Sequence, residues 1–131
     1  MKEMRVSTLQ IGILVLALVD AISHAFYVQF IVDSLSIGGY FLVSTILFAA
    51  GGFAALTSGK LFKPAVVGLI VLSLIDNVLI LITATTPTPL SGGQAFGFSM
   101  GWMPLGSVQV FVIQVVLMVV AKYALAKRKT A

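Results

Sequence analysis

Residues 64–84 read PAVVGLIVLSLIDNVLILITA, an apolar run of 21 residues with one charged side chain, Asp76. About 20 apolar residues are enough for a helix to cross the hydrocarbon core of a membrane. Similar apolar runs lie at 6–28, 38–58 and 106–125. We therefore predict an all-α integral membrane four-helix bundle. It forms a single transmembrane domain, 1–131, with an outer loop at 85–105.

The composition supports a membrane protein. Hydrophobic residues make up 60% of the chain and charged residues 9%, and the mean hydropathy is +1.14. A soluble domain has about 25% charged residues. This chain has too few charges to cover itself in water, so lipid is the expected surrounding. There is no cysteine, which excludes disulfides and thiolate metal sites.

All the basic residues fall before the first span, between the second and third, or at and after the end of the fourth. They are Lys2, Arg5, Lys60, Lys63, Lys122, Lys127, Arg128 and Lys129. With four spans, these places lie on one side of the membrane, which the positive-inside rule identifies as cytoplasmic. We predict a multi-pass protein of the cell membrane with both termini inside. Contact with anionic headgroups, not with nucleic acid, accounts for the net charge of +4.

The first and third spans share a pattern at an offset of 56 residues. Gly12 and Asp20 in the first span correspond to Gly68 and Asp76 in the third, eight residues apart in both. Both spans run outward in the predicted topology, so a duplication would produce two parallel helical hairpins. The second and fourth spans show no comparable match, and the duplication stays one of two alternatives.

Each predicted span carries a polar side chain at a similar depth, counted at about 1.5 Å per residue from its basic anchors. The set comprises Asp20, His24, Ser44 (or its neighbour Thr45), Asp76, Asn77 and Gln109. We expect these side chains to converge as an intramembrane polar layer. An ionisable residue within a span is energetically costly, and by default it indicates a functional site.

His24 follows Asp20 by one helical turn, so both side chains lie on one helix face. An Asp–His pair in a low-dielectric environment can share a proton, which is the chemistry of a proton relay. Two other interpretations stay open. The layer can serve to hold the helices together by hydrogen bonds. Alternatively His24 can bind haem, but the chain has no second histidine, and a haem iron would need another ligand from elsewhere.

Two features indicate contact surfaces. Gly51 and Ala55, four residues apart, form a small-residue face that allows close helix packing. In the outer loop, large apolar residues alternate with Gly or Ser, at Phe96, Phe98, Met100 and Trp102. Period two is typical of an extended segment with two unlike faces. We expect its apolar face to dock on a partner subunit, to lie among lipid headgroups, or to cover the bundle as a lid.

No enzyme motif and no metal-ligand spacing is present, so we expect no catalysis by this chain alone. The first hypothesis is a small accessory subunit of a larger, hetero-oligomeric membrane complex, such as an energy-converting complex of the respiratory type. The second is a small proton-coupled carrier that acts as a homodimer, with Asp20 and Asp76 as the exchanging carboxylates. The third is a haem- or quinone-binding membrane subunit.

Overall fold

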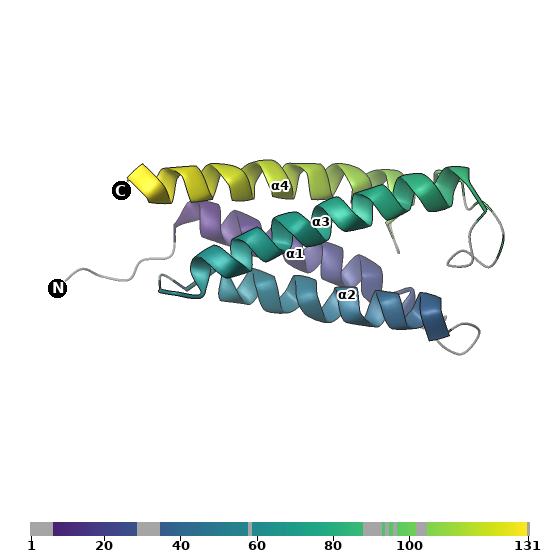
Figure 1. The fold of residues 1–131 in the computed structure, drawn as a ribbon, viewed down its shortest axis with the longest axis horizontal. Helices are drawn as coiled ribbons and strands as arrows, with labels where there is room; N and C mark the ends of the chain where they lie inside the picture. Colours follow the sequence, from purple (N-terminus) through teal and green to yellow (C-terminus); the bar gives the residue numbers. More distant parts are fainter. Residues whose placement is uncertain are drawn as a thin grey trace.

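The computed structural model describes residues 7–28, 35–57, 59–87, 93, 95, 97–101 and 105–130, with only the backbone at 35–37 and 128–130. Four α-helices account for most of these residues, and the all-helical prediction is confirmed. They are α1 (Thr8–Ala25), α2 (Leu35–Ala54), α3 (Phe62–Thr85) and α4 (Ser107–Thr130). The helices lie lengthwise beside one another, with the start of α1 and the end of α4 at the same end of the molecule (Figure 1).

Three of the helices are long and apolar enough to cross a membrane: Thr8–Ala25, Phe62–Thr85 and Ser107–Lys127. The corresponding apolar segment of α2 is shorter than these three. It covers Gly38–Ala54 among the residues whose side chains are described. Large apolar side chains are exposed along all four helices, such as Val15, Ile46, Leu74 and Val119. A chain with this surface is suited to lipid rather than to water.

Local chemistry explains where the helices begin and end. The Ser7 hydroxyl accepts a hydrogen bond from the Gln10 backbone N–H, and the Gln10 side chain accepts one from the Ser7 N–H. This capping box starts α1. Helix α3 begins at Phe62, and Pro64 lies in its first turn. Proline is tolerated there because the N–H groups of the first turn have no partner within the helix. Pro87 follows the end of α3, beyond Thr86.

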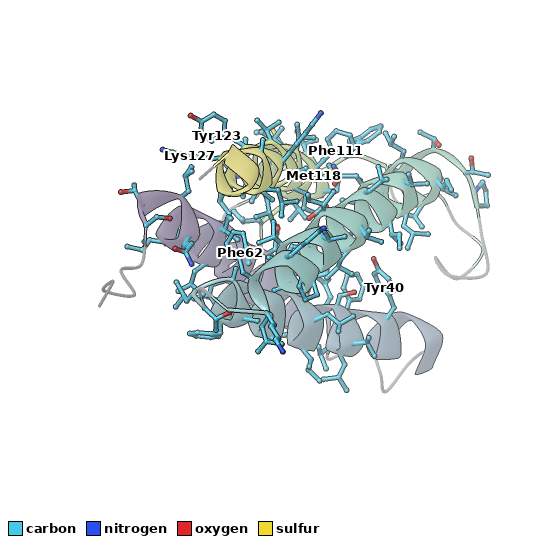
Figure 2. The ribbon with its side chains drawn as sticks, turned by 60° about the vertical axis from the view of Figure 1, so that its left-hand side comes forward. Tyr40, Phe62, Phe111, Met118, Tyr123 and Lys127 are labelled. Carbon is cyan, nitrogen blue, oxygen red and sulfur yellow. The ribbon has the colours of Figure 1, made fainter. Side chains whose placement is uncertain are left out.

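The core is built where each helix packs against two others. Helix α1 contacts α2 and α4, and α3 also contacts α2 and α4. Fully buried apolar side chains from all four helices fill the interior, namely Ile13, Ala17, Phe48, Ala55, Val66, Leu117 and Ala121. Phe62, also buried, closes this core at the start of α3 (Figure 2).

Small residues of α2 lie at its closest contacts. A Cβ atom added to Gly51 would lie 2.7 Å from the side chain of Leu69 on α3. A Cβ added to Gly52 would lie 2.9 Å from the Ala17 Cβ on α1. Of the residues singled out in the sequence, Ala55 is buried and Gly51 is half-buried at the contact with α3, while Gly52 lies at the close approach of α1 and α2.

Candidate functional site

Polar side chains from all four helices meet in the buried interior. Asp20 and His24 come from α1, Ser44 from α2, Asp76 and Asn77 from α3, and Gln114 from α4; each is at most 4% exposed. Their helical positions explain this placement: Asp20 continues the buried face of α1 that includes Ile13 and Ala17. A hydrogen-bonded group of this kind fixes the relative positions of the helices that contribute to it.

Asp76 is the centre of the group, because it accepts hydrogen bonds from three other helices. Its Oδ2 accepts from Gln114 Nε2 at 2.6 Å and contacts His24 Nε2 at 3.1 Å. Its Oδ1 accepts from the hydroxyl of Tyr40 on α2. Tyr40 projects from α2 toward α3 in Figure 2. Ser44, one turn along α2, is in side-chain hydrogen-bond contact with Tyr40.

His24 is held on both sides of its ring. Its Nδ1 lies 2.7 Å from the backbone carbonyl oxygen of Asp20, an acceptor, so Nδ1 carries a hydrogen and donates it. Its Nε2 then shares one proton with Asp76 Oδ2. The pair is net neutral whichever atom holds that proton. Phe41 and Phe48 pack against the ring, with centroids at 5.7 and 5.2 Å.

Asp20 has a different environment from Asp76. Its side chain is 0% exposed, and no described residue donates a hydrogen bond to either carboxylate oxygen. Its backbone carbonyl oxygen accepts a hydrogen bond from His24 Nδ1, and the other ring nitrogen of His24 contacts Asp76. A buried carboxylate without a partner is costly in an apolar interior. The two aspartates that correspond in the sequence pattern therefore have unlike surroundings: the Asp76 carboxylate has three partners, and that of Asp20 has none in the part of the chain that the structure describes.

Gln109 does not join the polar group, and this expectation is wrong. Its Oε1 accepts hydrogen bonds from the backbone N–H groups of Gly101, at 2.7 Å, and Gly106, at 3.0 Å. The loop before α4 needs acceptors for these N–H groups, and Gln109 in the first turn supplies one. Gln114, five residues later on the buried face of α4, contributes from that helix instead. In the sequence, Gln114 is recognisable only as a glutamine within an apolar span.

Thr45 also lies outside the group, because its hydroxyl donates to the Phe41 carbonyl oxygen of its own helix at 2.7 Å. Asn77 lies beside it: Nδ2 donates to the Phe111 carbonyl oxygen on α4 at 3.3 Å, and Oδ1 has no partner among the described residues. Ser73, one turn before Asn77, is buried with an unpartnered hydroxyl. Tyr40, Ser73 and Gln114 were not singled out from the sequence, since single hydroxyl and amide groups are common in membrane helices.

The described part of the outer loop exposes two large apolar side chains. Phe98 is 55% and Met100 76% exposed, whereas Phe96 and Trp102 lie outside the described residues. Backbone hydrogen bonds connect this segment to the helix ends, from the Gly97 N–H to the Ala84 carbonyl oxygen and from the Val108 N–H to that of Ser99. The segment is therefore fastened to α3 and α4 with its apolar side chains facing outward.

Within the described ranges, no group of three or more His, Cys, Asp or Glu side chains is placed to hold a metal ion. Both ring nitrogens of His24 take part in hydrogen bonds, so ligation of haem iron would require one of them to break. Comparison of the chain with known protein families, with characterised proteins and with solved structures finds no match.

Proposed function

We propose that the chain is a four-span membrane protein with both termini on the cytoplasmic side of the cell membrane. Two observations support this topology. The start of α1, the end of α2, the start of α3 and the end of α4 all lie at one end of the molecule. The basic residues of the sequence fall at these same helix ends. In this arrangement the helices form a bundle of two hairpins, and α1 and α3, which carry the Gly12–Asp20 and Gly68–Asp76 pattern, run in the same direction, as a duplicated hairpin requires.

Within this frame, the buried polar group favours the second hypothesis, a small carrier coupled to protons. The observation that carries it is the contact of His24 Nε2 with Asp76 Oδ2 at 3.1 Å, a distance at which the two groups can share one proton, together with the bonds to Asp76 from side chains of α2 and α4. A movement of any helix changes the donors around Asp76. A change of helix packing and a change in the site of the proton are thereby coupled, as a carrier requires.

A role in helix association alone explains Asp76 but not Asp20. Hydrogen bonds hold helices together only where both partners are present, and the Asp20 carboxylate has no donor among the described residues. In a purely structural group, an apolar side chain at this position would be more stable. The buried and unpartnered Asp20 is therefore better explained by an exchange that it takes part in, together with the nearby titratable groups His24, Tyr40 and Asp76.

The test uses proteoliposomes that contain a pH-sensitive dye. We expect protein-dependent proton movement when a pH gradient and a membrane potential are imposed, and its loss in Asp20→Asn and Asp76→Asn. Both substitutions preserve side-chain shape and remove the exchangeable proton. Asp33→Asn is the matched control, because the same change then falls between the first two spans of the sequence. Proton movement that persists in both Asp20→Asn and Asp76→Asn would exclude the carrier.

The outer loop favours a second candidate, the accessory subunit of a larger membrane complex. Phe98 and Met100 present apolar surface beyond the ends of the helices, where partners bind. Native mass spectrometry after gentle extraction from the source membrane tests it. Reproducible hetero-oligomers that are lost in a Phe98→Ser, Met100→Ser variant would support a subunit role. A lone homodimer would favour the carrier.

A further inference from the structure

Five oxygen atoms in the interior have no hydrogen-bond partner among the residues that the structure describes. They are Asp20 Oδ1 and Oδ2, Ser73 Oγ, Asn77 Oδ1 and Gln114 Oε1. The four residues are between 0% and 4% exposed, so bulk water does not satisfy these atoms. Buried polar atoms in folded proteins nearly always have a partner. A group of buried oxygen atoms without partners offers the surroundings that a bound cation or an ordered water molecule requires.

The four residues belong to one region of the interior. Ser73 and Asn77 are one turn apart on α3, and Asp76 lies between them. Gln114 donates through Nε2 to Asp76, which leaves its Oε1 as the free end of the same amide. His24 connects Asp20 to Asp76, because its Nδ1 donates to the Asp20 carbonyl oxygen and its Nε2 contacts Asp76 Oδ2. Three helices thus contribute these oxygen atoms, and hydrogen bonds connect the residues Asp20, His24, Asp76 and Gln114.

Charge decides what kind of ligand fits. The His24–Asp76 pair is neutral as a unit, so it provides no countercharge for Asp20. One monovalent cation neutralises this carboxylate, whereas a divalent cation leaves an excess positive charge in an apolar interior. Oxygen atoms from carboxylate, amide and hydroxyl groups are the ligands that hard cations prefer. A proton on Asp20 would supply one donor and leave most of the five oxygens without a partner.

We propose that Asp20, Ser73, Asn77 and Gln114 form a binding site for a monovalent alkali cation. The carboxylate supplies the charge, and the amide and hydroxyl oxygens replace part of the hydration shell. The proposal goes beyond proton-coupled transport, because cation binding to the resting protein requires no transport. The outcome of the proteoliposome test therefore leaves this site undecided, and binding is measured separately.

The experiment follows thermal unfolding of the full chain in detergent at constant ionic strength. NaCl and KCl are each compared with choline chloride, whose cation is too large for a site among buried side chains. A ligand that binds only the folded state raises the unfolding temperature. We expect NaCl or KCl to raise it by several degrees above choline chloride. Equal unfolding temperatures in all three salts would overturn the proposal.

Variants separate a specific site from a general salt effect. Asp20→Asn removes the charge and should abolish the cation-dependent shift. Ser73→Ala should weaken binding by about tenfold or more, the scale seen when partners of a metal site are lost. Ser23→Ala is the matched control, because this equally buried hydroxyl already donates to the Val19 carbonyl oxygen. If the cation-dependent rise in unfolding temperature is unchanged in Asp20→Asn and in Ser73→Ala, the site is refuted. If one of the two variants folds poorly, an unchanged rise in the other refutes it.

Discussion

Replacement of Asp76 by leucine should lower the stability of the protein more than any other single change in the polar group. The substitution keeps a side chain of similar size but removes the acceptor for Gln114, Tyr40 and His24 together. All of these donors come from other helices; the side chains of His24 and Gln114 are buried, and that of Tyr40 is half-buried. The change therefore leaves unpartnered polar atoms on α1, α2 and α4 at once.

The hydrogen bonds set the expected magnitude. Hydrogen bonds between helices in membranes contribute about 0.6 kcal/mol each on average, so the three around Asp76 give about 2 kcal/mol. Removal of one partner from a buried ion pair costs about 3–5 kcal/mol. We expect a loss in the free energy of unfolding of about 2–5 kcal/mol for Asp76→Leu. Tyr40→Phe removes a single bond and should cost about 0.6–1.7 kcal/mol.

The assay is equilibrium unfolding in mixed micelles, followed by circular dichroism of the helices. Thr83→Val is the control on the same helix, because the hydrogen bonds described for the Thr83 hydroxyl both stay within α3, to the carbonyl oxygens of Leu79 and Ile80. It should leave the free energy of unfolding nearly unchanged. If Asp76→Leu costs no more than Tyr40→Phe, Asp76 is not the centre of the polar group and the reasoning is refuted.

Three further changes test the packing in the same unfolding assay. Gly52→Val should cost about 1–3 kcal/mol by overpacking against Ala17; an unchanged stability would show that α1 and α2 do not approach closely there. Gly12→Ala should be neutral or stabilising by up to about 1 kcal/mol, since its Cβ meets nothing within 4 Å; a loss would indicate an unseen contact. Gln10→Leu removes the hydrogen bonds from Gln10 Nε2 to the carbonyl oxygens of Ala55 and Thr57, at 2.9 and 3.2 Å. It should lower the free energy of unfolding by about 1 kcal/mol. An unchanged value would mean that these bonds do not stabilise the end of α2.

The helices were predictable because their signal is local. An apolar run of about 20 residues can satisfy its backbone hydrogen bonds only as a helix in lipid, whatever it packs against. The same reasoning located Asp20, His24 and Asp76, since an ionisable group within such a run is conspicuous. It missed Tyr40 and Gln114, because single hydroxyl and amide groups are common in membrane helices. Counting residues from the basic anchors estimates how far along its helix a residue lies, but not which way its side chain faces. Gln109 illustrates the difference. Gln109 lies in the first turn of α4 and accepts from the backbone of the loop.

By itself, the sequence determined four helices and the chemical types of the buried polar residues, because both depend on composition along a single segment. Only the tertiary structure decided which residues are partners, because that depends on how each helix is rotated against its neighbours. The two aspartates illustrate this difference. Asp20 and Asp76 occupy equivalent places in a repeated pattern, yet side chains from three helices bind Asp76, and no described residue donates to Asp20.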